Sequence, residues 1–569
     1  MSSAHWVDCG NGVRLERGVR CPMSDRVQLV SDHYHPPQPG LHPTLLMRQP
    51  YGRDIASTVV YAHPAWFASH GYNVVIQDVR GRGDSEGEFY PFRHEASDGA
   101  ATIAWLRTRP ESNGRVGMYG FSYQGMTQFL AAAEQPEGLA CIAPGMAACD
   151  LYHGWFYHQG ALRLASSLGW GLQMLKADAR RHKLRDAGAL LEQAWANLAA
   201  QTSVLPFGDH PALHGEGMPA YVLDWFDHAL PGDYWSSMDV SRTLNRIHVP
   251  ALHISGWYDS YLRGTIAGFV ALCNQADSSA ARENQHLVAG PWQHIPWGDR
   301  VGAGDFGSAA LLDSDALLLR WFNHWLKDSG EFDSEPRIRH FVLGENCWRQ
   351  AEAWPSQPGK PFFLHSAGRA NSRKGNGSLT ATRPTAEPAD IFIYDPEVPV
   401  LAPGGPGPLS GQFDQAPLEL GNNVLVYTTP PLARPIRVFG APRISLYAAT
   451  SSTHTDFTAK LVRLRPDETA EFLCIGIARS NWLFAENYKA DTVHHWEFDL
   501  EPTSCYFAIG DSVRLEIASS AFPLYDRNPG TATPSHRATS WDWQRSTQIV
   551  YHDHEHPSAL YLPVSEDAA

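Results

Sequence analysis

Short apolar segments alternate with helical patterns over the first part of the chain. Strands are predicted at Val27–Val30, Thr44–Met47 and Val74–Ile76, and helices at Val59–Ser69 and Ala96–Arg107. Alternation of this kind is typical of a largely parallel sheet with helices on its faces. In such sheets, ligands gather at the carboxyl ends of the strands.

The pattern changes near Asp150. From Tyr152 to about Val249 the sequence is helical and aromatic, with no clear strand, which predicts an all-helical insertion. Strand patterns return at Ala251–Ile254 and His286–Ala289, and a helix is predicted at Ala309–Lys327. The second group of strands therefore continues the first sheet.

A third pattern begins after Trp354, where Pro, Gly and Ser cluster up to Pro384. Short alternating segments follow, at Ile391–Tyr394, Val424–Tyr427, Ile444–Tyr447, Thr458–Val462 and Val513–Ile517. Many short strands separated by turn residues indicate a β-sandwich or jelly roll.

The length of 569 residues is too great for one ordinary core. We therefore expect an α/β domain formed by residues 1–149 and 250–354, a helical insertion at 150–249, and a β domain at 355–569. The sequence shows no internal repeat of fixed period.

Composition narrows the class of protein. A hydrophobic content of 43% describes a packed globular protein, and the net charge of −15 argues against a nucleic-acid partner. The 8 cysteines are scattered without a Cys-x-x-Cys pair, which suits free thiols in a reducing cytosol. Neither a signal peptide nor an apolar run long enough to span a membrane is visible, so a cytoplasmic protein is expected.

The strongest chemical signal is Gly120-Phe-Ser122-Tyr-Gln-Gly125, which follows the apolar run Val116–Tyr119 and precedes a helical pattern. A serine on a sharp strand-to-helix turn presents its hydroxyl at the edge of a sheet. The second glycine comes one place later than in Gly-x-Ser-x-Gly. A capping serine in an ordinary strand-to-helix connection is the alternative for this motif.

Two further residues follow predicted strands and could complete a triad with Ser122. His294 ends Leu287-Val-Ala-Gly-Pro-Trp-Gln-His294, and Asp259 ends Ile254-Ser-Gly-Trp-Tyr-Asp259. A histidine can take the proton of the serine, and a carboxylate can fix the tautomer of that histidine. The order Ser122, Asp259, His294 is that of an α/β-hydrolase sheet.

Negative charge on the substrate carbonyl oxygen needs hydrogen-bond donors. The backbone N–H of Tyr123 is one by its position after the nucleophile. The second is expected from the loop after an early strand, where Tyr51 follows Arg48-Gln-Pro. A tyrosine packed on the sheet edge is the alternative for Tyr51.

Other motifs favour structural interpretations. Asp78-Val-Arg-Gly-Arg-Gly-Asp-Ser-Glu-Gly87 lacks dinucleotide-loop spacing and is expected to form a structured loop beside the catalytic edge. His552-Asp-His-Glu-His556 would place three histidines on one strand face, but no second ligand cluster supports a metal site, so a terminal strand is predicted. The aromatic residues Trp155 and Trp170 could line an apolar pocket or pack in a core.

Together these motifs resemble the cocaine esterase/X-prolyl dipeptidyl peptidase-like (CocE/NonD) family of serine hydrolases. The resemblance extends to Arg320-Trp-Phe-Asn-His-Trp-Leu-Lys327, Gly344-Glu-Asn-Cys-Trp-Arg349 and Phe522-Pro-Leu-Tyr-Asp-Arg-Asn-Pro529. The displaced glycine is explained by the Gly-x-Ser-Tyr-x-Gly form of this group. The resemblance implies an α/β-hydrolase domain with an inserted helical cap and a C-terminal β jelly-roll domain.

The resemblance also implies roles for individual residues. It assigns the nucleophile to Ser122, the acid to Asp259, the base to His294, and the oxyanion donors to the Tyr51 hydroxyl and the Tyr123 amide. It assigns the acyl pocket to three aromatic residues, Trp155, Trp170 and Tyr261. The His-rich tail matches a family motif, which supports its structural interpretation.

Departures from relatives bear on specificity. Asp259 is followed by Ser260-Tyr-Leu-Arg263, without the acidic residues that hold an ammonium group in α-amino-acid ester hydrolases. Arg263 could instead attract an anionic acyl group such as glutaryl, which is a hypothesis.

The sequence therefore predicts a serine esterase or acylase that acts on a small-molecule ester, or on an amide, through an acyl-enzyme, with no metal or cofactor. The alternatives are an X-prolyl dipeptidyl peptidase, an acylase for glutaryl or β-lactam side chains, and a catalytically idle binding protein. The natural substrate and the oligomeric state, including a homo-oligomer, are left open.

Overall fold

A computed structural model describes residues 5–55, 58–356 and 359–565 of the chain. Its organising element is an 11-stranded sheet with the order β1-β2-β3-β5-β4-β6-β7-β10-β11-β14-β15. The strands are β1 (His5–Asp8), β2 (Arg14–Pro22), β3 (Gln28–His35), β4 (His42–Gln49), β5 (Asn73–Asp78), β6 (Ser112–Phe121), β7 (Leu139–Gly145), β10 (Ala251–Tyr258), β11 (Gln285–Gln293), β14 (Ile338–Val342) and β15 (Cys347–Ala351). From β5 to β14 neighbouring strands are parallel, while β1–β3 and β15 pair in antiparallel fashion.

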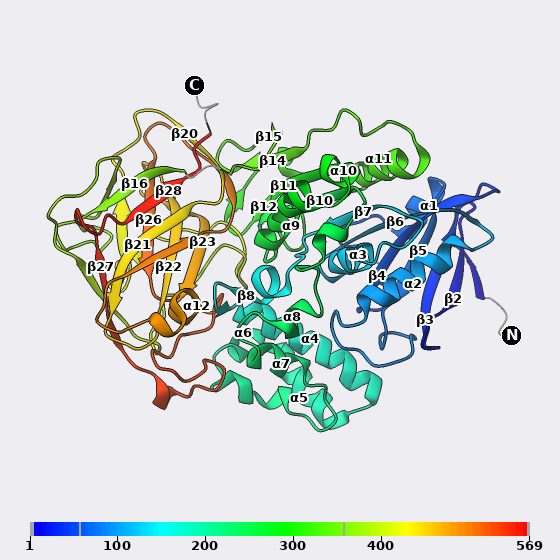
Figure 1. Ribbon diagram of the computed structural model, residues 1–569, viewed down its shortest axis with the longest axis horizontal. Coiled ribbons are helices and arrows are strands. Elements are labelled where there is room, and N and C mark those ends of the chain that lie inside the picture. Colours follow the sequence, from blue (N-terminus) through cyan, green and yellow to red (C-terminus); the bar gives the residue numbers. More distant parts are fainter. Residues whose placement is uncertain (1–4, 56–57, 357–358, 566–569) are drawn as a thin grey trace.

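Helices cover both faces of this sheet (Figure 1). They are α1 (Pro64–Ser69), α2 (Glu95–Arg107), α3 (Tyr123–Ala133), α9 (Leu262–Gln275), α10 (Ser279–Glu283) and α11 (Ser314–Lys327). Side chains on β4 alternate between faces, because Leu46 packs in the cluster of Ile103 and Phe129 while Leu45 packs in that of Trp321. The sheet is therefore apolar on both faces, as a parallel sheet between helices requires.

Two helices begin later than their sequence patterns predict. The turn before α1 ends at His63, whose side chain accepts a hydrogen bond from Ala65 N, and Pro64 opens the helix. Asp313 likewise caps α11 by accepting from Ala316 N. The predicted starts at Val59 and Ala309 were wrong because capping residues, not the apolar pattern, set these ends.

The segment between β7 and β10 is helical and forms the lower part of the molecule in Figure 1. It contains α4 (Leu164–His182), α5 (Arg185–Ala196), α6 (Leu198–Gln201), α7 (Tyr221–Asp227) and α8 (Asp233–Ser236), the π-helix η1 (Tyr152–Phe156), and the 3-10 helices η2 (Phe207–Asp209), η3 (Pro211–Leu213) and η4 (Leu244–Arg246). The expectation of no strand here was wrong for one two-residue hairpin, β8 (Tyr157–His158) with β9 (Ala161–Leu162). We refer to this segment as the cap.

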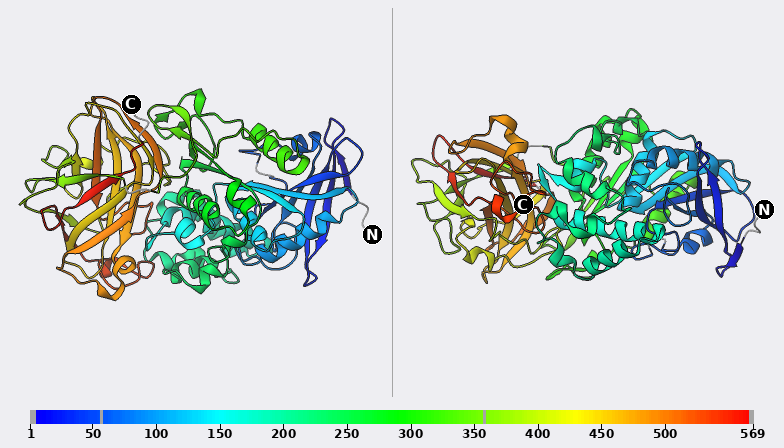
Figure 2. Two further views of the ribbon diagram at one scale, coloured as in Figure 1. Left: turned by 45° about the horizontal axis from the view of Figure 1, so that its top comes forward. Right: turned by 90° about the horizontal axis from the view of Figure 1, so that it is seen from below.

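The C-terminal part is a separate β lobe beside the hydrolase sheet in both views of Figure 2. Its main sheet has the order β18-β27-β21-β28-β16-β17-β19-β26-β22-β23, with β24 paired to β21, and β20 pairs with β25. The strands are β16 (Lys360–His365), β17 (Ser378–Thr380), β18 (Asp390–Tyr394), β19 (Leu425–Thr428), β20 (Ile436–Gly440), β21 (Arg443–Thr450), β22 (Asp456–Leu464), β23 (Ala470–Arg479), β24 (His494–Asp499), β25 (Thr503–Phe507), β26 (Ser512–Ala518), β27 (Ser546–Tyr551) and β28 (Ala559–Leu562).

Short elements complete the chain. They are β12 (Arg300–Val301), β13 (Gly304–Asp305), η5 (Ser308–Ala310), η6 (Leu418–Leu420), α12 (Ser480–Phe484), η7 (Ala485–Asn487) and η8 (Ser540–Asp542). Among the described residues, no helix is both long and apolar enough to cross a membrane.

The main core of the β lobe is continuous with that of the hydrolase domain. One buried cluster joins Trp257 and Phe269 of the hydrolase domain to Leu461, Phe472 and Cys505 of the β lobe. The fold is therefore an α/β-hydrolase domain with an inserted helical cap and a C-terminal β domain packed against it, as the sequence predicts. The residue numbers given above for the domain boundaries stay predictions.

Candidate active site

Ser122 lies at an abrupt turn between β6 and α3. Its φ of 62° is in the left-handed region, which is uncommon for a residue with a side chain. Backbone hydrogen bonds hold this conformation, because Ser122 N donates to Gly145 O (2.9 Å) and Ser122 O accepts from Gly125 N (2.9 Å). A strained, fixed backbone of this kind presents the hydroxyl at the carboxyl end of the sheet.

Two glycines make the turn possible. A Cβ at Gly120, whose φ is 130°, would lie 2.5 Å from Cβ of Gln124. A Cβ at Gly125 would lie 2.5 Å from Cβ of Ala147 and 3.0 Å from the carbonyl oxygen of Gly145. α3 thus packs tightly against the end of β7 at position 125, which gives the physical reason for the displaced second glycine.

Asp259 and His294 meet although they are 35 positions apart in the sequence. Each follows the end of a parallel strand, β10 or β11, and the Nδ1–H of His294 donates to Oδ1 of Asp259 at 2.7 Å. The carboxylate is 1% exposed, and its Oδ2 accepts from Tyr261 N at 3.1 Å. This contact fixes the tautomer of His294 and leaves Nε2 to act as a base.

The imidazole of His294 lies over the nucleophile turn. Its ring centroid is 5.4 Å from that of Phe121, the residue before Ser122, and 5.2 Å from that of Tyr261. The structure therefore gathers all three residues of the sequence-predicted triad at one edge of the sheet. Their catalytic roles are taken up below as a proposal.

Tyr51 stands next to Ser122 on the loop after β4. Its hydroxyl accepts a hydrogen bond from Trp170 Nε1 at 3.3 Å. Burial raises the pKa of Tyr51 to about 12, so the phenol keeps its proton at neutral pH. A protonated phenol beside the nucleophile is suited to donate to a developing oxyanion.

Tyr123 has a backbone N–H without an acceptor within α3, because it is the first residue of that helix. Two hydrogen bonds fix its phenol: the hydroxyl donates to Glu95 Oε1 at 2.8 Å and accepts from Phe92 N at 3.0 Å. Glu95 is buried and pairs with Arg48 Nη1 at 2.8 Å. Burial raises the pKa of Glu95 and the charge of Arg48 opposes that rise.

The sequence reasoning missed Glu95. A carboxylate in the first turn of a predicted helix looks like a favourable helix-dipole residue, and only the tertiary structure shows it buried under the nucleophile turn. The one sequence signal for a buried partner was the basic residue Arg48 in the motif Arg48-Gln-Pro-Tyr51, which pairs with Glu95 in the structure.

Three aromatic residues predicted to contact the acyl group lie together beside the turn. Trp155 stacks on Tyr261 with centroids 3.9 Å apart and an interplanar angle of 25°, and it lies 5.9 Å from Trp170. Phe92, which the sequence reasoning missed, contacts both tryptophans at 5.2 and 5.8 Å. The π-helix η1 carries Trp155 and turns it toward Tyr261.

Arg263 contacts the cap and lies close to the β lobe. Its Nη1 lies 3.1 Å from Nε2 of His158, and Nδ1 of His158 lies 2.7 Å from the hydroxyl of Tyr525 in the β lobe. Burial lowers the pKa of His158, so the imidazole is neutral and accepts from the guanidinium. These contacts place Arg263 at the domain interface, and the anionic-acyl hypothesis stays a prediction.

The loop that begins at Asp78 is tightly ordered. Arg53 bridges the carboxylates of Asp32, Asp78 and Asp84 at 2.8, 2.6 and 2.6 Å. A Cβ at Gly83 would lie 2.0 Å from Asp78 Oδ2, so the chain turns directly over this carboxylate. The sequence expectation of a structured loop agrees with these contacts.

The His-rich tail is not a strand face. β27 ends at Tyr551, and the three histidines fall in the turn before β28. His552 is buried with its Nε2 2.9 Å from Asp390 Oδ2, while His556 Nδ1 lies 3.2 Å from Asp553 Oδ1. The predicted period-two arrangement was wrong because residues 552–557 form a turn.

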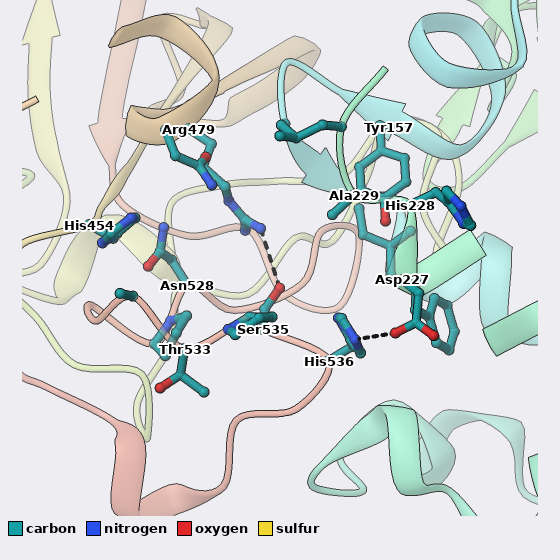
Figure 3. A pocket seen from close by; sticks show the side chains of 18 of the residues that line it. Tyr157, Asp227, His228, Ala229, His454, Arg479, Asn528, Thr533, Ser535 and His536 are labelled. Atoms are coloured by element: carbon teal, nitrogen blue, oxygen red, sulfur yellow. Dashed lines mark hydrogen bonds and ion pairs between the residues drawn. The ribbon is translucent and has the colours of Figure 1, made fainter. Parts of the chain in front are cut away.

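A cavity of about 470 Å³ lies elsewhere, between the cap and the β lobe (Figure 3). Its walls include Asp227 of the cap and His536 of the β lobe, which pair at 2.9 Å across it. Arg479 also faces the cavity, but its guanidinium already binds two buried carboxylates. Its lining residues do not include the proposed triad, so this cavity is distinct from the candidate active site.

Comparison with known proteins agrees with this arrangement. Residues 25–296 match the X-Pro dipeptidyl-peptidase (S15) family, and residues 330–561 match the X-Pro dipeptidyl-peptidase C-terminal non-catalytic domain. A cocaine esterase of Rhodococcus sp. (strain MB1 Bresler) is 34% identical over 571 residues, which cover 96% of this chain and 98% of that protein.

Solved structures extend the likeness to the whole fold. An α-amino acid ester hydrolase aligns with a TM-score of 0.79 and 25% identity over 98% of both chains. An aminopeptidase from the marine sediment archaeon Thaumarchaeota archaeon aligns with a TM-score of 0.79 and 24% identity over 97% of both chains.

Proposed function

This chain belongs to the cocaine esterase/X-prolyl dipeptidyl peptidase-like family of serine hydrolases, and from that premise we propose that it cleaves carboxylic esters through an acyl-enzyme on Ser122. The observation that carries the proposal is the His294–Asp259 hydrogen bond of 2.7 Å beside a strained serine turn. A base with a fixed tautomer next to a serine hydroxyl at the edge of the sheet is what acyl transfer to serine requires.

In the first step, His294 Nε2 takes the proton of Ser122 as Oγ attacks the ester carbonyl carbon. The carbonyl oxygen becomes an oxyanion, which accepts hydrogen bonds from the Tyr51 hydroxyl and the Tyr123 N–H. Collapse of the tetrahedral intermediate breaks the ester C–O bond, and His294 gives its proton to the leaving alcohol.

Deacylation repeats these steps with water. His294 takes a proton from the attacking water, the oxyanion forms again at the same donors, and the proton returns to Ser122 Oγ as the acid leaves. Asp259 keeps its hydrogen bond to Nδ1 of His294 throughout and stabilises the imidazolium.

Neutral aromatic side chains dominate the space beside Ser122. Apolar ring faces are supplied by Trp155, Trp170 and Tyr261. The indole N–H of Trp170 donates to the Tyr51 hydroxyl and is therefore not available to a substrate. An uncharged apolar or aromatic acyl group is therefore the best match for this surface. A small-molecule ester is the substrate that we propose, while a homo-oligomer and a cytoplasmic location stay predictions.

Labelling with a fluorophosphonate probe tests the nucleophile. Wild-type protein should be labelled, Ser122→Ala should not, and Ser69→Ala, which changes a serine at the end of α1, should behave as wild type. Labelling of Ser122→Ala at the wild-type rate would refute the assignment of the nucleophile.

Asp259→Asn should reduce kcat by about 10⁴, because the wrong histidine tautomer is then favoured.

The family match supports one second candidate, cleavage of X-Pro peptides. Comparing kcat/KM for p-nitrophenyl esters with that for Gly-Pro anilides separates the two. A preference for the anilide would establish the peptidase.

A further inference from the structure

Two buried glutamine side chains connect the nucleophile turn to the loop that carries Tyr51. Gln124 Oε1 accepts from the N–H of Phe121 at 3.1 Å, and Gln124 Nε2 donates to Gln49 Oε1 at 3.2 Å. Gln49 Nε2 in turn donates to the carbonyl oxygen of Gly52 at 2.9 Å. We call this series of contacts the glutamine relay.

The ends of the relay fix the orientation of both amides. Phe121 presents an N–H, which can only donate, and Gly52 presents a carbonyl oxygen, which can only accept. Turning either amide over would place donor against donor or acceptor against acceptor at two contacts. Gln124 and Gln49 are 1% and 0% exposed, so solvent does not compensate for such mismatches.

The relay spans the two sides of the proposed oxyanion site. Phe121 immediately precedes Ser122, while Gln49 and Gly52 enclose Tyr51 at the end of β4. The Gln49–Gly52 contact closes this turn around Tyr51, and the Gln124–Gln49 contact joins it to α3, where the N–H of Tyr123 lies.

Donors stabilise an oxyanion only when both lie about 2.7–3.1 Å from it. A displacement of about 1 Å costs roughly 10²-fold in rate. Because Tyr51 lies on a loop and Tyr123 on a helix, something must hold one relative to the other. The glutamine relay is a direct side-chain connection between these two elements.

We propose that Gln49 and Gln124 are positioning residues that set the Tyr51 hydroxyl relative to the Tyr123 amide. The proposal rests on the function proposed above and deepens it. Gln124 stands where the simplest nucleophile motif has glycine, and the relay gives that position a function in the oxyanion site.

A double-mutant cycle tests the relay. The substitution Gln49→Met is made in the wild type and in Tyr51→Phe, and kcat and KM are measured with a p-nitrophenyl ester. Methionine keeps the length of the side chain and removes its amide. In the wild type we expect kcat to fall by about 10- to 100-fold with KM changed by less than about twofold. In Tyr51→Phe the same substitution should change kcat by less than about twofold, because the hydroxyl that it misplaces is absent.

A matched control separates positioning from general damage. Gln285 is also a fully buried strand glutamine, with contacts to His253 Nε2 (3.0 Å) and to the carbonyl oxygen of Ala281 (2.7 Å), at the start of β11. Gln285→Met should lower Tm without lowering kcat in either background.

Equal loss of kcat from Gln49→Met in both backgrounds, or no loss in the wild type, would overturn the relay. If Gln49→Met does not fold, Gln49→Asn, whose shorter amide cannot reach both partners, is read in the same cycle. Failure of the serine mechanism itself would appear as activity retained by Ser122→Ala, so the two outcomes are distinguishable.

Discussion

At the scale of the residue, the site depends on groups whose burial controls their proton state. Tyr51 accepts a hydrogen bond from Trp170, and burial raises the pKa of its phenol to about 12. The hydroxyl therefore remains a donor over the whole pH range in which a histidine base operates.

Tyr51→Phe removes that donor and leaves the ring in place. We expect kcat to fall by about 10²–10³, equivalent to about 2.7–4 kcal/mol of transition-state stabilisation, with a small change in KM. Steady-state kinetics with an activated ester measures it, and an unchanged Tm confirms that folding is spared. A loss below about threefold would assign the second oxyanion donor elsewhere.

At the scale of the element, the nucleophile turn is set by how closely α3 approaches β7. Gly125 permits the contact, since a Cβ there would meet Ala147 and the Gly145 carbonyl. The Cβ of Ala147 and the carbonyl oxygen of Gly145 are both buried and close-packed, so moving either of them costs free energy.

Gly125→Ala should destabilise the protein by about 1–3 kcal/mol, because the added methyl forces α3 away from the sheet. Gly188→Ala is the matched control, since a Cβ at that position of α5 meets only Cβ of Ala179 at 3.8 Å. That change should be neutral or stabilising by up to about 1 kcal/mol, as helix propensity predicts. Thermal unfolding of the two variants side by side measures both, and equal Tm values would contradict the packing argument.

At the scale of the whole molecule, the three parts are joined by buried contacts and by charges. Arg163 of the cap, fully buried, binds Glu501 of the β lobe, and Arg82 of the Asp78 loop pairs with Asp178 of α4 at 3.0 Å. Glu345, between β14 and β15, binds Arg349 Nε at 2.9 Å and Arg437 Nη2 of the β lobe at 2.5 Å. These ties hold the lobe beside the sheet that carries the triad.

The Glu345 contact should make the stability of the fold depend on pH. Hydrogen bonds from Arg349 and Arg437 lower the pKa of Glu345 from 4.5 to about 2. A depressed carboxyl pKa stabilises the folded state above the unfolded pKa, and this contribution is lost as the pH falls through the folded pKa. Glu345→Gln should therefore lower Tm at pH 7, and the difference from wild type should shrink between about pH 4.5 and 2.

Thermal unfolding of both proteins across that range tests the prediction. Glu352→Gln, at an exposed position just after β15, is the control and should follow the wild-type curve. A Tm difference for Glu345→Gln that stays constant down to pH 2 would show that its effect is not electrostatic.

Much of the architecture could be predicted from the sequence, because it follows from local patterns. Apolar runs marked the strands β4, β5, β10 and β11, and turn-rich alternation marked the β lobe. Strand ends also placed Ser122, Asp259 and His294 at one edge, since parallel strands of one sheet share an edge. The α/β-hydrolase fold and the family were within reach for this reason.

The sequence by itself thus determined which residues lie at the carboxyl edge of the sheet. Only the tertiary structure decided what lies beneath and between them: Glu95 under Tyr123, the amides of Gln49 and Gln124, and the direction of Arg263. Such side chains have several possible partners, and the choice among them depends on long-range packing that leaves no local pattern in the chain.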